Sequence, residues 1–231
     1  MLKIEKLNQY YSESHTLWDI DLELEEARCN CLMGRNGVGK TTLLNCIMGL
    51  QAVRSGSIVF KGQELTRINA EKRASLGIGY VPQGRQIFPL LSVKENLQIG
   101  LGARADRAKE IPGFIYDLFP VLKDMLNRRG GDLSGGQQQQ LAIGRALVVD
   151  PSLLILDEPT EGIQPNIVQE IGDIIRQLSN DIGLTVLLVE QKLPIVRRIA
   201  DNFSILDRGR KVASGQIDAL SDELISQYLT V

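Results

Sequence analysis

Long apolar runs and an excess of positive charge are both missing from this 231-residue sequence. No apolar run approaches the roughly 18 residues of a membrane-spanning helix, and Lys3, Glu5 and Lys6 interrupt any apolar leader at the N-terminus. We therefore expect a chain that is cytosolic in itself and that reaches a membrane only through another chain. Its 26 basic and 28 acidic residues give a net charge of −2 at pH 7, which argues against a nucleic-acid partner.

Residue types that bind metals through nitrogen or sulfur are scarce. His15 is the only histidine, and the three cysteines are Cys29, Cys31 and Cys46. A structural zinc site would need more ligands than these at suitable spacing. Cys29 and Cys31 fall two positions apart on an expected strand, so they should share one face of it. We expect them to be reduced residues that pack in the core.

Short apolar runs of strand length alternate with amphipathic segments, which predicts an α/β fold. Residues 166–179 have apolar side chains at helical spacing and separate two apolar runs, which predicts a right-handed crossover and a parallel sheet. The N-terminal segments instead predict antiparallel β-structure. Strands are expected at Leu2–Leu7, Trp18–Leu24, Cys29–Met33, Ser57–Phe60, Ile78–Val81, Leu153–Leu156 and Thr185–Val189, and helices at 41–50, 166–179 and, as one or two helices, 217–229.

Residues 85–133 differ in character from the segments on either side. Their apolar residues, such as Ile115 and Leu122, recur at helical spacing between glycine, proline and arginine residues. We interpret this segment as a small helical subdomain that is inserted into a single α/β domain. On this interpretation the core of the domain comprises residues 1–84 and 134–231.

A phosphate-binding loop is predicted where the pattern G-x-x-x-x-G-K-[ST] falls between an expected strand and an expected helix. Its glycines let backbone N–H groups surround phosphate oxygens, and the following helix adds the positive end of its dipole. Lys40 should reach the β- and γ-phosphates of a nucleotide, Thr41 should ligate Mg²⁺, and Thr42 should bond the α-phosphate. The loop reads Gly34-Arg35-Asn36-Gly37-Val38-Gly39-Lys40-Thr41.

Two adjacent carboxylates, Asp157 and Glu158, end the apolar run Leu153–Leu156. Open α/β sheets bind ligands at the carboxyl ends of their strands, so Asp157 should hold Mg²⁺ there. Pro159 follows and starts a turn that these carboxylates could cap. The two interpretations are compatible, because a carboxylate at a strand end can serve both the turn and a ligand.

A third motif, Leu133-Ser134-Gly135-Gly136-Gln137, is unsuited to a helix interior because glycine is a poor helix former. It does fit the N-terminus of a helix that continues through Leu141 and Leu147. Such a terminus binds anions. A simple helix cap is the competing interpretation.

The three motifs in this order resemble those of the ATP-binding subunits of ABC transporters, and the resemblance covers almost the whole chain. It implies that the chain binds ATP and Mg²⁺ and that Glu158 acts as general base on the attacking water. It also implies that Ser134, Gly135, Gly136 and Gln137 contact ATP held by a partner subunit. Hydrolysis would then require a head-to-tail pair of subunits.

The resemblance also implies partners and further site residues. The second ATP-binding subunit would be a paralogue or another copy of this chain. Both subunits would attach to membrane permease subunits, to which a solute-binding protein delivers the solute. Such a subunit lies at the cytoplasmic face of the inner membrane. Gln83 falls at the family's glutamine loop, where it would sense Mg²⁺ and the attacking water. Tyr11 falls where an aromatic ring stacks on adenine, with the adjacent Tyr10 as the alternative.

Two positions depart from the usual pattern of the family. Gln191 stands where a histidine usually contacts the γ-phosphate, and its amide can donate a hydrogen bond but cannot become charged. Gln164 stands where the loop after the catalytic glutamate often has an Asp. Both departures resemble importers of branched-chain amino acids, amides and urea, and residues 31–44, 128–147 and 158–165 are most similar to urea-importer subunits. We therefore expect urea or short amides as the solute, with branched-chain amino acids as the alternative.

ABC proteins that act on DNA or ribosomes form the competing class. Only residues 41–132 separate Lys40 from Leu133, and they contain no heptad run for the long coiled coil of DNA-maintenance members. Ribosomal members carry two cassettes, and this chain has one. An inactive regulatory subunit is disfavoured by Lys40, Asp157 and Glu158. Phe88 is a candidate apolar contact for a permease, with burial in the helical subdomain as the alternative.

Overall fold

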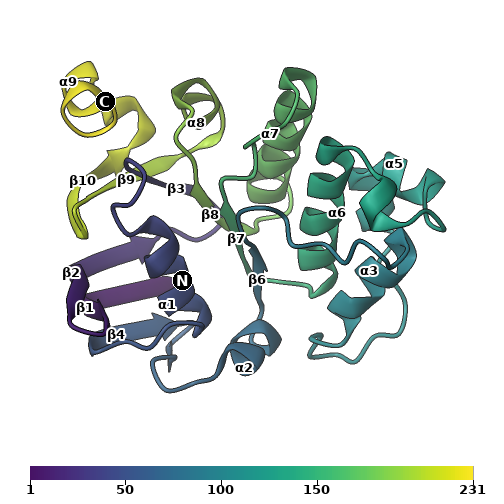
Figure 1. Cartoon of the computed structure of the whole chain (residues 1–231), viewed down its shortest axis with the longest axis horizontal. Coiled ribbons are helices and arrows are strands. Elements are labelled where there is room, and N and C mark those ends of the chain that lie inside the picture. The colour runs from purple at the N-terminus through teal and green to yellow at the C-terminus, as the bar shows by residue number, and fades with distance from the viewer. Residues whose placement is uncertain (231) are drawn as a thin grey trace.

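The computed structural model describes residues 1–230 as two β-sheets with helices packed between and around them (Figure 1). The N-terminal sheet has the strand order β2-β1-β4-β5 and is antiparallel. The second sheet has the order β10-β9-β3-β8-β7-β6 and is parallel except for the β10–β9 pair. The strands are β1 (Leu2–Tyr11), β2 (Ser14–Leu24), β3 (Cys29–Met33), β4 (Ser55–Phe60), β5 (Gln63–Glu64), β6 (Ile78–Val81), β7 (Leu153–Asp157), β8 (Thr185–Val189), β9 (Asn202–Asp207) and β10 (Arg210–Gln216).

Helices connect the parallel strands and form the part of the molecule at the right of Figure 1. Within residues 1–230, none of them combines the length and apolar character that crossing a bilayer would take. The helices are α1 (Lys40–Met48), α2 (Ala70–Ser75), α3 (Val93–Leu101), α4 (Phe114–Leu118), α5 (Pro120–Asp124), α6 (Gly135–Val148), α7 (Pro165–Asn180), α8 (Leu193–Ile199) and α9 (Asp222–Tyr228), with 3-10 turns η1 (Gly130–Asp132) and η2 (Ile217–Ala219).

The central strands are buried on both faces, which explains why most of their residues are apolar. Successive residues point to opposite faces, so Cys29 and Cys31 enter one hydrophobic core while Leu32 enters the other. The first core includes α6 and α7, and the second lies between this sheet, α1 and the N-terminal sheet. Both cysteines are free and buried, as expected from their spacing.

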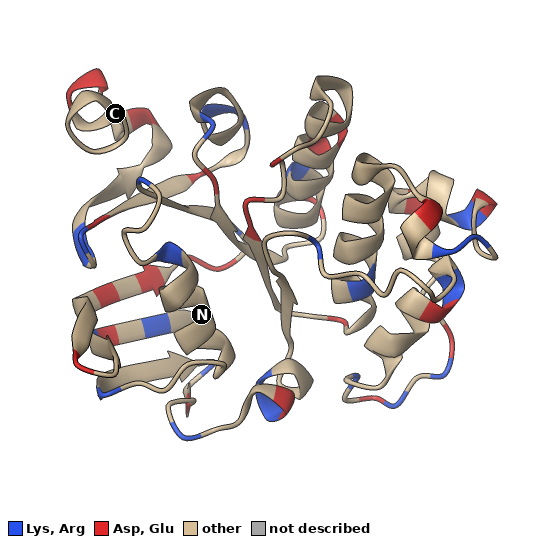
Figure 2. Cartoon of the chain, viewed as in Figure 1, with Lys and Arg blue, Asp and Glu red and all other residues tan. Residues whose placement is uncertain are grey.

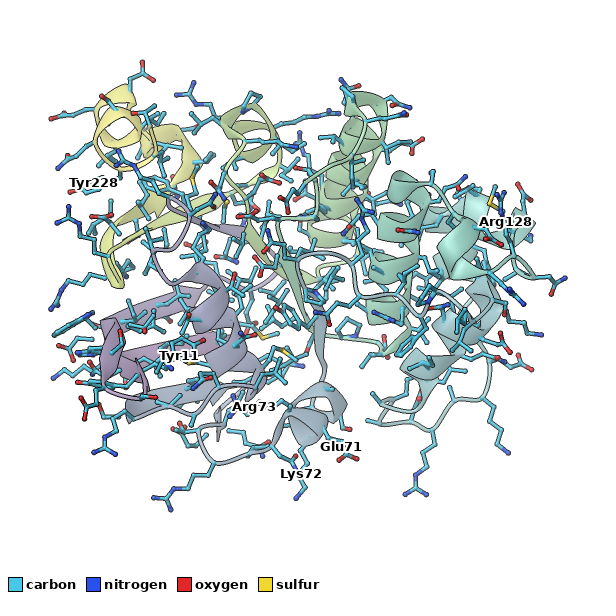
Figure 3. The ribbon with its side chains drawn as sticks, in the orientation of Figure 1. Tyr11, Glu71, Lys72, Arg73, Arg128 and Tyr228 are labelled. Atoms are coloured by element: carbon cyan, nitrogen blue, oxygen red, sulfur yellow. The ribbon has the colours of Figure 1, made fainter. Side chains whose placement is uncertain are left out.

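Helix α1 lies between the two sheets with its apolar face buried, and it begins directly at the phosphate loop. It ends at Gly49, which has a left-handed backbone with φ of 73°. Arg73 completes this end by donating hydrogen bonds to the carbonyl oxygens of Cys46 at 2.7 Å and Ile47 at 2.8 Å (Figure 3). The buried guanidinium therefore satisfies the Ile47 carbonyl and adds a second donor to the Cys46 carbonyl, which also accepts from the Gly49 N–H.

Helices α3, α4 and α5 all fall within residues 85–133, where the sequence predicts helices. Ser92 and Glu95 form a capping box at the start of α3. Ile115 and Leu122 are buried in the same core as the inner face of α6. This segment therefore packs against the long helix that follows it rather than forming a core of its own.

The expected fold class, an α/β chain with an antiparallel N-terminal sheet and a mixed core sheet, is confirmed. The predicted strands at Cys29–Met33, Ile78–Val81 and Thr185–Val189 have the same bounds in the structure. Elements α2, α8, β5, β9 and β10 were not predicted from the sequence. Of these, the β9–β10 hairpin matters most for the site, because its turn touches the phosphate loop.

Candidate active site

Acidic residues gather where β7 and β8 end, next to the loop that joins β3 to α1 (Figure 2). The loop, Gly34–Thr41, needs glycine at two positions for steric reasons. A Cβ on Gly34 would lie 2.3 Å from the carbonyl oxygen of Leu206, and Gly39 caps α1 with a φ of 108°. The β9 strand thus holds the backbone of the loop at close range.

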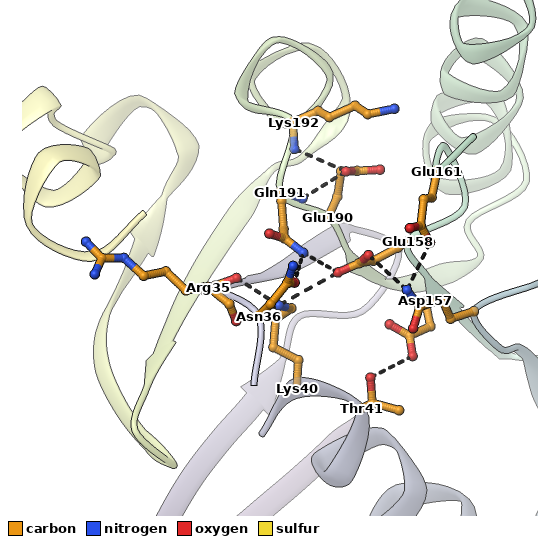
Figure 4. A network of polar contacts seen from close by, with 12 residues as sticks. Arg35, Asn36, Lys40, Thr41, Asp157, Glu158, Glu161, Glu190, Gln191 and Lys192 are labelled. Carbon is orange, nitrogen blue, oxygen red and sulfur yellow. Dashed lines mark hydrogen bonds and ion pairs between the residues drawn. The ribbon is translucent and has the colours of Figure 1, made fainter. Parts of the chain in front are cut away.

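Lys40 folds back into its own loop in this structure. Its Nζ donates to the carbonyl oxygens of Gly34 at 2.8 Å and Arg35 at 2.9 Å, and lies 3.7 Å from a carboxylate oxygen of Glu158 (Figure 4). Burial lowers the pKa of the ammonium, and the neighbouring carboxylates oppose that shift. A phosphate would offer the ammonium a stronger, charged acceptor than these two carbonyls.

Thr41 and Asp157 meet across the site, although they are far apart in the sequence. The Thr41 hydroxyl donates to a carboxylate oxygen of Asp157 at 3.2 Å. Burial raises the pKa of Asp157 to about 6, because the carboxylate is 2% exposed and the Lys40 ammonium only partly offsets the cost. Two adjacent oxygen ligands, one of them a buried carboxylate, fit Mg²⁺, which usually takes one or two carboxylates together with phosphate oxygens.

Glu158 has a left-handed backbone, with a φ of 48° that is uncommon outside glycine. Its N–H donates to the carbonyl oxygen of Val189 at 2.9 Å, which fixes the turn after β7. The carboxylate accepts hydrogen bonds from the side-chain amides of Gln83, at 3.4 Å, and Gln191 (Figure 4). Strained backbone of this kind is concentrated at functional sites.

Each of the two glutamines also donates to an acceptor other than Glu158. Gln83 also donates to Glu161 at 2.9 Å, and Gln191 also donates to the side-chain oxygen of Asn36 at 2.7 Å. The structure therefore connects the phosphate loop with the ends of β6, β7 and β8 through polar side chains. Gln164, by contrast, lies apart from these contacts at the start of α7.

Glu190 is a residue of this site that the sequence analysis missed. It is 3% exposed, and its carboxylate accepts hydrogen bonds from the Thr160 hydroxyl at 2.5 Å and from the backbone N–H of Gln191 at 2.8 Å. Lys192 then donates to the carbonyl oxygen of Thr160 at 2.7 Å. Glu190 ends an apolar run just as Asp157 does, and that repeated pattern is the signal that could have identified it.

The segment Ser134–Gln137 caps α6. The Ser134 N–H donates to the side-chain oxygen of Gln137 at 3.0 Å, and the Gln137 N–H donates to the Ser134 hydroxyl at 3.4 Å. The motif therefore begins a helix that Ser134 caps, which is compatible with either interpretation of this segment. Gly136 is also needed for packing, since a Cβ there would lie 2.8 Å from a methyl carbon of Ile167.

A cavity of about 690 Å³ opens over this segment, and no residue of the phosphate loop lines it. It is bounded by Ser134–Gln137, by residues 162–164 and by α7. The loop and the capped end of α6 thus face different spaces within one chain.

Tyr11 and Tyr10 lie at the end of β1, near the start of α1 (Figure 3). The Tyr11 hydroxyl lies 3.5 Å from the Thr42 hydroxyl, and its side chain is 45% exposed. Tyr10 is already engaged, because its ring stacks on His15 with 4.0 Å between centroids. The geometry therefore leaves the face of Tyr11 available beside the phosphate loop.

The remaining loop residues have individual surroundings. The carbonyl oxygen of Val38 accepts a hydrogen bond from the Gly209 N–H at 2.9 Å. The Arg35 side chain points away from Lys40 and donates to the Thr230 carbonyl near the C-terminus (Figure 4). A Cβ on Gly37 would meet nothing within 4 Å, so this glycine borders open space.

Comparison with known proteins places these features in a family. A family model described as ABC transporter matches residues 17–161, which is more than half of the chain. The chain is 40% identical over 213 residues to the high-affinity branched-chain amino acid transport ATP-binding protein BraG of Pseudomonas aeruginosa, covering 92% of this chain and 91% of that one. It is 39% identical over 221 residues to the probable branched-chain amino acid transport ATP-binding protein LivF of Archaeoglobus fulgidus, covering 95% and 94%.

Solved structures agree with this placement. A nucleotide-free ATP-binding cassette from an ABC transporter superposes with a TM-score of 0.84 at 27% identity, covering 99% of this chain and 94% of that one. The ADP conformation of another such cassette gives a TM-score of 0.83 at 27% identity, covering 98% and 97%.

Proposed function

This chain belongs to the ABC transporter ATP-binding family, whose members hydrolyse ATP, and we propose that it powers a solute importer. One observation carries the proposal. Lys40, Thr41, Asp157 and Glu158 converge at the carboxyl edge of the sheet, where a nucleotide triphosphate and a divalent cation would be held. A regulatory subunit without activity would have no need for this complete set of groups.

In the proposed reaction, Lys40 leaves the carbonyl oxygens of its loop and binds the β- and γ-phosphates of ATP. Thr41 and Asp157 would hold Mg²⁺, which would supply positive charge to neutralise the phosphates. Glu158 accepts a proton from the attacking water. Gln191 and Gln83 hold the Glu158 carboxylate between them and sense whether the γ-phosphate is present.

We propose that the capped end of α6 completes the site of a second subunit. Ser134, Gly135, Gly136 and Gln137 line a space that excludes their own phosphate loop, so their phosphate contact would come from another chain. A head-to-tail pair would then enclose two nucleotides. The partner is either a second copy of this chain or a paralogue, and hydrolysis would reopen the pair.

Contact with a membrane permease is proposed at the segment that follows Gln83. Phe88 is 45% exposed and Leu90 is 81% exposed, so the exposed alternative for Phe88 holds and burial in the helical subdomain does not. Arg145 of α6 stacks on the Phe88 ring at 5.2 Å and donates to the carbonyl oxygen of Gln86 at 2.8 Å. Movement of the segment after Gln83 would thus reach Phe88 through Gln86 and Arg145. Through the permease, the chain would sit at the cytoplasmic face of the inner membrane.

Branched-chain amino acids are the better-supported solute. The two relatives near 40% identity carry that assignment, and they match the chain over more than nine-tenths of its length. The resemblance to urea-importer subunits, on which urea was expected, has no comparable support. We therefore place urea and short amides second, and a solute-binding protein would deliver either class to the permease.

Reconstitution tests both levels of this proposal. The chain would be placed in liposomes with a candidate permease pair, a partner ATPase and a solute-binding protein, and phosphate release would be followed with leucine or with urea. Stimulation by leucine supports the proposed solute, whereas stimulation by urea alone reverses the order of the two solutes. Glu158→Gln in the same liposomes controls for contaminating ATPases. Stimulation by DNA or ribosomes, without a permease, would favour the competing class.

A further inference from the structure

An aromatic stack runs along the surface beside the phosphate loop. The Tyr10 ring lies 4.0 Å from the His15 ring, centroid to centroid, with 11° between their planes. The His15 ring lies 3.5 Å from the Trp18 ring, and the guanidinium carbon of Arg210 lies 4.9 Å from the centroid of Trp18. These four side chains come from β1, β2 and β10, so the stack joins the N-terminal sheet to the β9–β10 hairpin.

One end of the stack is tied to the phosphate loop through backbone hydrogen bonds. The Trp18 N–H donates to the carbonyl oxygen of Gly209 at 2.8 Å, and the Gly209 N–H donates to the carbonyl oxygen of Val38 at 2.9 Å. Gly209 has a φ of 74°, and a Cβ there would lie 2.0 Å from the carbonyl oxygen of Thr16. The turn can therefore approach both segments only because it is glycine.

The other end of the stack adjoins Tyr11. Tyr10 and Tyr11 are consecutive on β1 and point to opposite faces, so a stacked Tyr10 leaves Tyr11 directed toward Thr42 of α1. The pairing of β1 with β2 is irregular here, with register shifts on both sides of Gln9. A one-residue slip would turn Tyr11 to the other face. Tyr10 and His15 are paired across β1 and β2, so their stacking favours the observed register where the backbone pairing is irregular.

We propose that the stack of Tyr10, His15, Trp18 and Arg210 holds the adenine-binding face of Tyr11 in line with the phosphate loop. These are positioning residues, because they act through Tyr11 and need not touch the nucleotide. The inference rests on the proposed function, in which ATP binds the loop and adenine stacks on Tyr11. It goes further by assigning part of the affinity for the base to side chains that lie outside the nucleotide site.

A stack that merely stabilised the hairpin would act differently. Loss of a purely structural contact would weaken binding of every ligand of the loop, or of none. Loss of alignment would weaken the contact with the base and spare the contact with the phosphates. Inorganic tripolyphosphate with Mg²⁺ engages the loop without a base, so the ratio of its affinity to that of ATP separates the two possibilities.

The test is titration calorimetry of the full chain with MgATP and with Mg-tripolyphosphate. His15→Ala should lower the affinity for ATP about tenfold, the size of a lost stacking contact, and that for tripolyphosphate less than about twofold. His15→Phe keeps a flat ring between Tyr10 and Trp18 and should stay within about threefold of the native chain for both ligands. Emission of Trp18, the only tryptophan, reports whether the stack is lost.

A second pair of variants removes the dependence on one substitution. Arg210→Ala removes a cation from the Trp18 ring, whereas Lys61→Ala removes a cation that lies 5.8 Å from the Phe60 ring on β4. Only Arg210→Ala should lower the ratio of ATP to tripolyphosphate affinity. Equal losses for both ligands, or no loss for either, in His15→Ala and Arg210→Ala would overturn the inference.

Tyr11→Ala distinguishes this inference from the function on which it rests. A selective loss of ATP affinity in Tyr11→Ala, without one in His15→Ala, would leave adenine on Tyr11 and reject the positioning stack. No selective loss in Tyr11→Ala would reject the adenine contact itself, and the positioning role with it. Selective losses in both variants are the expected result.

Discussion

Gln191 donates a hydrogen bond from its side-chain amide to the carboxylate of Glu158, and the same amide nitrogen reaches the side-chain oxygen of Asn36. Gln191, the second residue after β8, is thus joined both to the proposed general base and to the phosphate loop. A γ-phosphate that entered this space would compete for the same amide. On the proposed function the pair would have one arrangement with nucleotide and another without it, and the site residues can be tested through that competition.

Glu158→Gln should retain ATP binding and lose hydrolysis by about a hundredfold or more, since general-base catalysis contributes roughly that much. The phosphate cradle around Lys40 is unchanged, so the ATP-bound pair of subunits should live longer. Phosphate release and ATP affinity measure the two effects. Glu161→Gln is the matched control, because Glu161 also accepts from Gln83 but does not approach Lys40. Near-native turnover of Glu158→Gln would remove this residue from the role of base.

Gln191→Ala should lower hydrolysis about tenfold, which corresponds to a lost contact of ~1.4 kcal/mol in the transition state. A neutral amide contributes less to an ionised phosphate than a charged donor, so the loss should be smaller than that of Glu158→Gln.

Gln191→His tests the same contact through charge. This variant should stay active and acquire a pH dependence near neutrality, because histidine titrates there. A pH–rate series on the native chain and the two Gln191 variants gives the answer. Turnover and pH profiles that match the native chain in both variants would reduce Gln191 to a residue that only shapes its turn.

Asp157→Asn should stabilise the nucleotide-free chain at neutral pH. Burial raises the folded-state pKa of Asp157 from 3.8 to about 6, so the folded state binds its proton more tightly than the unfolded state does. The stability that this proton contributes is fully present below pH ~3.8 and is lost as pH rises through about 6. The isosteric amide avoids the buried charge and should gain up to ~3 kcal/mol at pH 7.5.

Urea titrations of both proteins at several pH values check the sign. The advantage of Asp157→Asn should fall to about half near pH 5 and vanish below about pH 4. Asp181→Asn, at an exposed position, is the control and should change the free energy of unfolding by less than about 0.5 kcal/mol. An advantage that grew as the pH was lowered would contradict the assigned direction. Saturating Mg²⁺ should favour the native Asp157 instead.

Lys40→Ala and Ser134→Arg should complement each other if the chain pairs with itself. Lys40→Ala removes a charge-assisted phosphate contact and weakens ATP binding, whereas Ser134→Arg blocks the cavity at the start of α6. Each variant alone should be inactive, and an exchanging mixture should regain one intact site per mixed pair. Mixtures as inactive as either parent would favour a paralogue as the partner.

The sequence by itself determined much of the fold, for a local reason. The strands Cys29–Met33 and Thr185–Val189 are buried on both faces, so apolar residues predominate in them and the runs could be recognised without knowing their partner strands. The amphipathic helix α7 could also be predicted from the sequence alone, because its buried residues Ile171 and Ile175 fall one turn apart. Strand β10 has no such signature: its residues alternate between exposed and partly buried, and it lies at the edge of the sheet.

The candidate site divides in the same way. Gly34–Thr41 is a contiguous motif, so its phosphate-binding role can be predicted from the local sequence. Asp157 and Glu158 can be predicted in the same way, because they follow an apolar run of strand length. Glu190, Asn36 and Gly209 act through contacts with segments far away in the chain, and no local pattern specifies those contacts. Only the tertiary structure decided which side chains share the Glu158 carboxylate and that Tyr10 is stacked while Tyr11 faces α1, because packing brings together elements that the sequence merely orders.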